Sequence, residues 1–99
     1  MKGIARPRDS STVSCEIQIT NKLGLHARPA AAFVRRANAF RSEISLVTAA
    51  GRFSALSLID VMRANLKCGA VATLEATGPD AAEAVERLAQ TVRELHDRP

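Results

Sequence analysis

The sequence predicts an α+β fold in which three helices cover one face of a four-stranded antiparallel sheet. Apolar and polar residues alternate without exception from residue 13 to residue 20, as they do in a strand with one buried face. Apolar residues recur at helical spacing from residue 30 and again from residue 81. The predicted order is strand, helix, strand, strand, helix, strand, helix, which lets the helices gather on one face of an antiparallel sheet.

The amino-terminal half contains the first three strands and the first helix. The inward face of the first strand consists of Val13, Cys15, Ile17 and Ile19. A helix is expected from about residue 27 to residue 38, where Ala30, Ala31, Val34 and Ala37 keep helical spacing. Two pairs of apolar residues mark the next two strands, namely Ile44 with Leu46 and Phe53 with Ala55. A hairpin near residues 49 to 51 joins these strands.

The carboxyl-terminal half contains two helices and the fourth strand. A short helix is predicted from about Ser57 to Ala64, and Asn65 can end it in a left-handed conformation. The apolar face of the fourth strand consists of Ala70, Ala72, Leu74 and Ala76. The last helix begins after Gly78-Pro79-Asp80, and its apolar positions are Ala81, Ala84, Val85, Leu88, Val92 and Leu95.

A histidine lies where the first helix is predicted to begin. Unpaired N–H groups and the helix dipole favour an anion at this end of a helix. An imidazole nitrogen is nucleophilic near neutral pH, and Arg28 can make a charge-assisted contact to phosphate oxygens. We therefore predict that His26 carries a phosphoryl group, stabilised by Arg28 and by the backbone N–H of Ala27.

Two structural alternatives apply to this histidine. His26 could serve only as a helix cap, but Ser, Thr, Asp or Asn would cap better, so capping does not explain the choice of histidine. Pro29 also leaves the helix start open, because proline prefers the first helical position and is tolerated elsewhere in the first turn. The cap is therefore Arg28 or His26, and both assignments leave the imidazole beside free N–H groups.

Two segments carry a resemblance to a known family. They are Ile19-Thr20-Asn21-Lys22-Leu23-Gly24-Leu25-His26-Ala27-Arg28-Pro29-Ala30 and Ala55-Leu56-Ser57-Leu58-Ile59-Asp60-Val61-Met62. The first resembles the active-site signature of the HPr family, the histidine-containing phosphocarriers of the bacterial phosphotransferase system, and the second resembles that family's serine-centred motif. The resemblance covers essentially everything after residue 12 and implies an open-faced sandwich. The runs Thr20-Asn21-Lys22-Leu23-Gly24 and Glu75-Ala76-Thr77-Gly78-Pro79 resemble the nitrogen-related branch in particular.

The resemblance implies a carrier rather than an enzyme. His26 is then expected to take a phosphoryl group from enzyme I, to hold it on its δ nitrogen, and to pass it to an EIIA-type acceptor domain. No cofactor or metal is expected, because the sequence contains no metal-ligand cluster or nucleotide-binding loop. The alternative is a regulatory adaptor whose phosphorylation state controls partner proteins, as the nitrogen branch suggests. We expect a monomer, because a carrier alternates between partners.

Ser57 has a structural and a regulatory interpretation. The pattern Ser-x-x-Asp across Ser57 and Asp60 is typical of a capping box, in which the serine accepts an N–H bond, and we favour this role. In some HPr proteins a dedicated kinase phosphorylates the matching serine, so the resemblance adds HPr kinase/phosphorylase to the partners considered. In those HPr proteins the segment around the serine commonly carries glycine where this chain has Asp60. The Asp60 carboxylate would repel a phosphoserine.

The short helix has more apolar residues than one of its faces can bury. It contains Leu58, Ile59, Val61 and Met62, with Leu56 just before and Leu66 just after. We expect some of them to face solvent beside His26 and to bind partner proteins. The candidates are Leu58, Ile59 and Met62, together with Ala31 of the first helix. The alternative is that all of them are core, because a small domain needs every buried methyl group.

Length and composition limit the remaining functions. The 99 residues are enough for one small domain. A net charge of +4 and a pI near 9.8 favour acidic partners, and the cations expected near the active end are Lys22, Arg28, Arg63 and Lys67. The only aromatic residues are three phenylalanines in periodic segments, which argues against nucleic-acid binding. No apolar stretch is long enough to span a bilayer.

The termini and the cysteines complete the sequence-based predictions. Residues 1 to 12 are expected to form a flexible basic tail, and residues 13 to 97 the phosphocarrier domain. Cys15 and Cys68 lack the spacing of a metal site or redox motif, so we expect free thiols and a reducing cytoplasm. His96 is assigned only a favourable interaction with the carbonyl end of the last helix.

Overall fold

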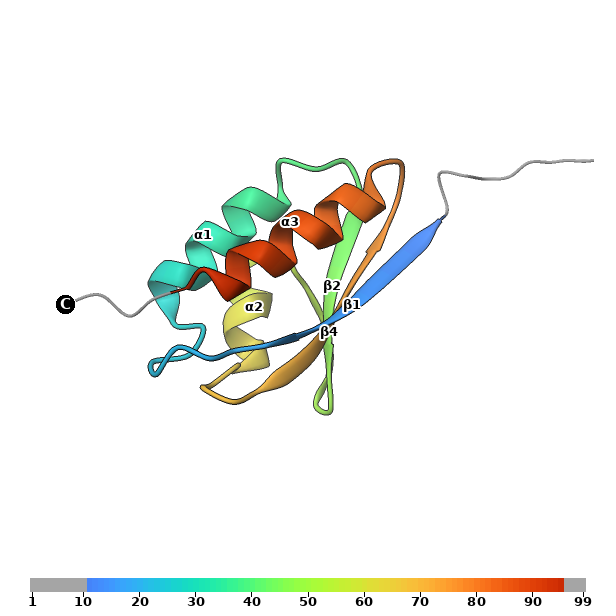
Figure 1. The fold of residues 1–99 in the computed structure, drawn as a ribbon. Coiled ribbons are helices and arrows are strands. Elements are labelled where there is room, and N and C mark those ends of the chain that lie inside the picture. Colours follow the sequence, from blue (N-terminus) through green and yellow to red (C-terminus); the bar gives the residue numbers. More distant parts are fainter. Residues whose placement is uncertain (1–10, 96–99) are drawn as a thin grey trace, which may run out of the picture.

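The computed structural model describes residues 11–95 and arranges four strands and three helices in the predicted order (Figure 1). The strands are β1 (Thr12–Gln18), β2 (Glu43–Thr48), β3 (Gly51–Ser54) and β4 (Val71–Thr77). The helices are α1 (Ala27–Ala37), α2 (Leu58–Ala64) and α3 (Ala81–Arg93). All three helices lie on one side of the sheet, so the predicted α+β class is confirmed.

The strands form one antiparallel sheet in the order β1-β4-β2-β3. Leu74 of β4 lies between Cys15 of β1 and Leu46 of β2, and Leu46 pairs in turn with Phe53 of β3. Side chains that pair directly across a sheet point to the same face. This row therefore turns toward the helices, where Leu46 and Leu74 are completely buried.

The core lies between this face of the sheet and the helices. The predicted inward positions of α3 are buried, namely Ala81, Ala84, Val85, Leu88 and Val92. The helix ends at Arg93, so Leu95 lies just beyond it and packs against the core from outside the helix. Ile17 of β1 is buried, while Val13 and Cys15 are partly buried against the same core, which confirms the predicted alternation.

The ends of the predicted elements agree closely with the observed ones. The hairpin between β2 and β3 turns through Ala49 and Ala50, with Thr48 paired to Gly51. Asn65 ends α2 with φ 53° and ψ 52°, the left-handed conformation expected from the sequence. Asparagine tolerates this conformation better than most residues because its short amide can hydrogen-bond locally.

The loop between α1 and β2 is joined to the start of α3. Asp80 is the N-cap residue of α3, but its carboxylate accepts hydrogen bonds from the Ser42 hydroxyl at 2.6 Å and from the Arg41 N–H at 2.9 Å. The Ser42 hydroxyl and then the Arg41 N–H hold the pKa of the Asp80 carboxyl below its ordinary value, because both stabilise the charged form. This contact joins two segments that are far apart in the sequence.

The first strand begins at Thr12, which pairs with Thr77, one residue before the predicted domain boundary. Apart from Ser11 and Thr12, the predicted tail lies outside the described residues, as does His96. Cys15 is the fourth residue of β1, and Cys68 lies just before β4. Both thiols are free, as predicted.

Candidate functional site at the start of the first helix

His26 is the N-cap residue of α1 and does not use its side chain as a cap. Its backbone is extended, with φ −81° and ψ −172°, and its carbonyl accepts the N–H of Ala30 at 2.9 Å. The imidazole makes no capping hydrogen bond. Of the two cap assignments that the sequence left open, the structure selects His26, and Pro29 occupies the third helical position.

The first turn of α1 presents two adjacent N–H groups beside this imidazole. Pro29 has no N–H, so the donors of the first turn are Ala27 and Arg28, and neither donates to another of the described residues. The dipole of α1 adds partial positive charge at the same end. This geometry suits a dianionic group on His26, because the N–H groups and the exposed Arg28 side chain can approach its oxygens.

The loop before His26 is held against the segment that follows α2. The side-chain amide of Asn21 donates to the carbonyl of Gly24 at 2.8 Å, and the N–H of Leu25 donates to the carbonyl of Leu66 at 2.7 Å. Gly24 has φ +69°, and a Cβ there would lie 2.7 Å from the carbonyl oxygen of Leu66. Only glycine fits this left-handed position and this close backbone approach.

The chain around His26 is strongly basic. Between Glu16 and Glu43 there is no acidic residue, and the five cations are Lys22, Arg28, Arg35, Arg36 and Arg41. The four cations expected at the active end, Lys22, Arg28, Arg63 and Lys67, are all exposed. The loop of Lys22 lies against the backbone of Lys67, whereas Arg63 forms an ion pair of 3.5 Å with Asp60.

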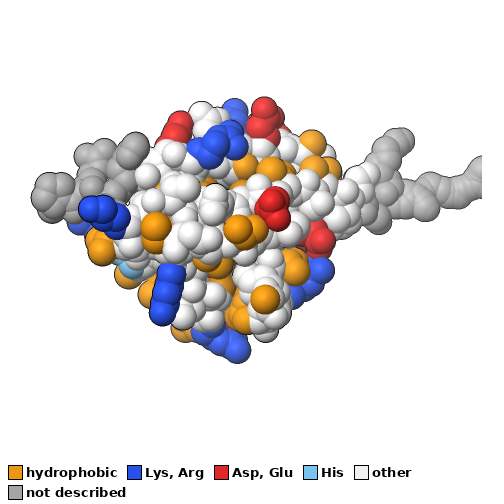
Figure 2. Space-filling view, turned by 60° about the horizontal axis from the view of Figure 1, so that its bottom comes forward, with side chains coloured by type: hydrophobic (Ala, Val, Ile, Leu, Met, Phe, Trp, Pro, Cys, Tyr) orange, Lys and Arg blue, Asp and Glu red, His pale blue; other side chains and the backbone are white. Residues whose placement is uncertain are grey.

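The predicted docking residues of α2 are exposed. Ile59 is 71% exposed, Met62 42% and Leu58 41%, whereas Val61 and Leu66 are buried. The alternative that all apolar residues of this segment belong to the core is therefore wrong. Ala31 of α1 is half-buried. In Figure 2 the histidine is visible as a small pale-blue area near the left edge of the molecule, next to hydrophobic and basic side chains.

One further exposed apolar residue at this end of the molecule was not predicted. Leu23 is 63% exposed in the loop that precedes His26. The signal in the sequence was a leucine between Lys22 and Gly24, in a turn where neither strand nor helix periodicity provides a reason to bury it. We call the set Leu23, Leu58, Ile59 and Met62 the apolar surface.

Ser57 is the N-cap residue of α2, as predicted. Its hydroxyl accepts the N–H of Asp60 at 3.3 Å. The Asp60 carboxylate accepts the N–H of Ser54 at 3.1 Å and interacts with Arg63 in the last turn of α2. Because the hydroxyl already serves the helix, the favoured structural role of Ser57 is confirmed.

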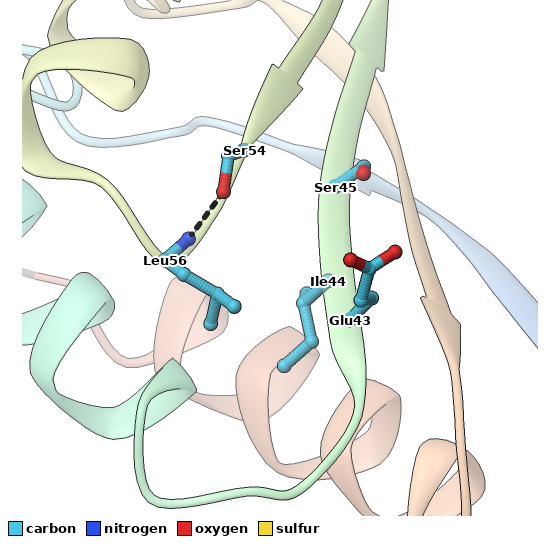
Figure 3. A pocket seen from close by; sticks show the side chains of 5 residues that line it. All are labelled: Glu43, Ile44, Ser45, Ser54 and Leu56. Carbon is cyan, nitrogen blue, oxygen red and sulfur yellow. Dashed lines mark hydrogen bonds between the residues drawn. The ribbon is translucent and has the colours of Figure 1, made fainter.

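A small depression lies at the start of β2, and no residue of the His26 loop lines it. It has a volume of about 130 Å³ and is lined by Glu43, Ile44, Ser45, Ser54 and Leu56 (Figure 3). The hydroxyl of Ser54 accepts the N–H of Leu56 at 3.2 Å, so it serves the local turn. Residues 11–95 contain no group of three metal-ligating side chains, and no helix in that range combines the length and hydropathy needed to cross a membrane.

The fold is a small sheet covered by three helices with a candidate histidine at a helix end, an arrangement that suits a carrier protein. A family model described as "PTS HPr component phosphorylation site" matches residues 13–94. The chain therefore belongs to the HPr family of phosphocarrier proteins of the phosphotransferase system.

Individual relatives support this membership. The phosphocarrier protein HPr of Vibrio cholerae is 42% identical over 81 residues, which cover 82% of this chain and 95% of the relative. The HPr-like protein Crh of Bacillus subtilis is 39% identical over 82 residues, which cover 83% and 96%. The crystal structure of an HPr from Bacillus anthracis has a TM-score of 0.78 at 36% identity and covers 82% of this chain and 96% of that structure.

Proposed function

We propose that His26 takes a phosphoryl group from a phosphohistidine of enzyme I and delivers it to a histidine of an EIIA-type acceptor domain. The observation that carries this proposal is the position of His26 as a cap residue whose imidazole makes no capping bond, beside the two N–H groups of Ala27 and Arg28. Such a group can be loaded and unloaded from solvent without opening a pocket.

The transfer exchanges one phosphorus–nitrogen bond for another. A ring nitrogen of His26, the δ nitrogen by family resemblance, attacks the phosphorus with its lone pair, and the donor imidazole leaves with the electrons of the bond that breaks. The N–H groups of Ala27 and Arg28 and the Arg28 guanidinium neutralise the phosphoryl oxygens. Delivery to the acceptor is the same step in reverse, so little transfer potential is lost.

Partner recognition rests on the exposed side chains around His26. Leu58, Ile59 and Met62 of α2, with Ala31 of α1, provide the apolar contacts, and the basic loop and helix favour acidic partners. Since donor and acceptor must each bring a histidine to His26, they bind this face in turn. We therefore propose a cytoplasmic monomer that alternates between partners.

The test is phosphorylation with phosphoenolpyruvate and enzyme I. The wild-type protein should take up one acid-labile phosphoryl group, and His26→Ala should take up none. His96→Ala is the matched control, since His96 is the only other histidine, and it should label like the wild type. Label that survives in His26→Ala would refute the assignment. Arg28→Ala should label more slowly while the far-UV circular dichroism stays unchanged.

A second candidate is a regulatory adaptor whose phosphorylation state controls its partners. The feature that favours it is the run Thr20-Asn21-Lys22-Leu23-Gly24, which resembles the nitrogen-related branch. Capture of binding proteins with phosphorylated and unphosphorylated chain separates the two roles. Recovery of sugar-branch acceptor domains alone would rule out the regulatory role.

A further inference from the structure

We propose that Asn21 is a positioning residue for phosphoryl transfer, because it fixes the peptide group that leads into His26. This inference rests on the proposed function and concerns the orientation of the imidazole, not the binding of partners. Asn21 is 8% exposed, and the other buried polar residues of the described chain are Ser42 and Thr91. Burial of an amide side chain costs free energy unless the amide is hydrogen-bonded, so the partner of this amide indicates its role.

One peptide group before His26 is held at both of its polar atoms. The carbonyl of Gly24 accepts the side-chain amide of Asn21 at 2.8 Å. The N–H of Leu25 donates to the carbonyl of Leu66 at 2.7 Å. Since this carbonyl and this N–H belong to the same planar peptide group, they point in opposite directions and turn together. The two hydrogen bonds therefore hold this group, which we call the clamped peptide, against rotation.

The clamped peptide needs these bonds because it follows a glycine. A residue without a Cβ permits many backbone angles, and Gly24 has φ +69° in a turn that its own N–H closes on the carbonyl of Asn21 at 3.0 Å. Ile19, at the other end of this loop, is anchored by backbone hydrogen bonds to Gly69 and Ala70. Without the Asn21 amide, the carbonyl of the buried Gly24 would lose this donor, and the peptide could flip to find another.

His26 is thereby fixed from both sides. On the helix side, its carbonyl accepts the N–H of Ala30 at 2.9 Å, which starts α1. On the loop side, it follows directly from Leu25, whose N–H belongs to the clamped peptide. A flip of that peptide would turn the imidazole away from the N–H groups of the first helical turn. Since transfer depends on the alignment of the reacting nitrogen with the phosphorus and with these donors, the Asn21 hydrogen bond acts on the rate of the transfer step.

The experiment compares Asn21→Ala with Asn38→Ala in phosphorylation of the carrier by phosphoenolpyruvate and enzyme I. Asn38 is the matched control, because its amide donates to the carbonyls of Val34 and Leu56 at 2.9 and 3.1 Å, at the other end of α1. Asn21→Ala should lower kcat by about tenfold, because a small displacement of a reacting group slows transfer strongly. Its KM should stay unchanged, since the exposed residues of α2 remain in place. Asn38→Ala should leave both constants unchanged.

A spectroscopic measurement separates positioning from a general loss of stability. The ring-proton resonances of His26 should shift in the NMR spectrum of Asn21→Ala and should stay unchanged in that of Asn38→Ala. Asn21→Leu is a second variant, because leucine has a shape similar to that of asparagine but no hydrogen-bond donor. It should show the same fall in kcat even if the smaller alanine loosens the packing of the loop.

The results that would overturn the inference leave the proposed function intact. They are a wild-type kcat in both Asn21 variants, an equal fall of kcat in Asn38→Ala, or a change in KM alone. In each case His26 is still labelled, so the histidine remains the carrier of the phosphoryl group. Absence of His26 labelling in the wild type removes the proposed function, and the inference with it.

Discussion

The N–H of Leu25 donates a 2.7 Å hydrogen bond to the carbonyl of Leu66, and this bond joins the loop that carries His26 to the segment after α2. The N–H of Gly69 also donates to the carbonyl of Ile19 at 2.6 Å, so the two segments are joined at more than one point. As a result, the start of α1 and the exposed face of α2 form one surface. In the proposed docking mode, a partner bound to α2 would therefore meet His26 in a fixed position.

Gly24→Ala should destabilise the fold and slow phosphoryl transfer. The left-handed φ of +69° alone should cost about 1 to 3 kcal/mol for a non-glycine residue. The added methyl group would also meet the carbonyl oxygen of Leu66 at 2.7 Å, which pushes the loop off the segment after α2. Urea unfolding measures the first effect, and labelling of His26 by enzyme I measures the second.

Gly69→Ala is the control for the close approach of Gly24 to the carbonyl of Leu66. Gly69 also has a positive φ, of +90°, but a Cβ there has no atom within 4 Å among the described residues. The Gly69→Ala variant should lose stability through backbone strain alone, so its free energy of unfolding should fall by less than that of Gly24→Ala. Equal losses in the two variants would show that the close approach to Leu66 contributes nothing.

Ser57→Ala should lower the free energy of unfolding by about 0.5 to 2 kcal/mol, because the first turn of α2 loses its side-chain cap. Ser57→Thr should retain most of the stability, since its hydroxyl can accept the same N–H of Asp60. Thermal unfolding followed by circular dichroism compares the two variants. Full stability of Ser57→Ala would contradict the capping role.

Ile59→Asp should weaken docking without affecting the fold. Ile59 is 71% exposed, so its removal costs little packing, while a carboxylate there would repel the acidic partner proposed for this surface. We expect KM for enzyme I to rise and the melting temperature to stay unchanged. Ala82→Asp is the control, because it adds the same charge in the first turn of α3, whose start is joined to the loop after the far end of α1. Equal KM values for the two variants would count against docking through α2.

Asp80→Asn should remove a contribution to stability that depends on pH. The pKa of the Asp80 carboxyl is lowered by the Ser42 hydroxyl and the Arg41 N–H, so the folded protein binds the proton less tightly than the unfolded chain. Its contribution is therefore present above the unfolded pKa of about 4 and is lost as the pH falls through the lower, folded value. The variant should be less stable than the wild type near neutral pH.

Urea unfolding between about pH 2 and about pH 7 tests this pH dependence. The difference between wild type and Asp80→Asn should narrow as the pH falls below about 4. Glu86→Gln removes an exposed carboxylate from the same helix and measures the general effect of losing one negative charge. A difference from the wild type that is the same at every pH would contradict the role of the charged Asp80 carboxylate.

Periodicity was sufficient to predict the architecture, because it follows directly from local geometry. Alternation in β1 and helical spacing in α3 each place one face toward the core in any structure the chain adopts. The left-handed end of α2 at Asn65 and its cap at Ser57 were likewise predictable, since both depend on a single residue type at a helix end. The motif around His26 also predicted the family.

Only the tertiary structure decided how the site is assembled. Proline is sterically tolerated at more than one position of the first turn, so the sequence left both His26 and Arg28 as possible caps. The contact of Gly24 with Leu66 joins segments about forty residues apart, and local sequence rules do not specify such a pairing. The sequence by itself determined the fold and singled out His26 as the candidate nucleophile, whereas packing between distant segments decided which side chains lie near that histidine.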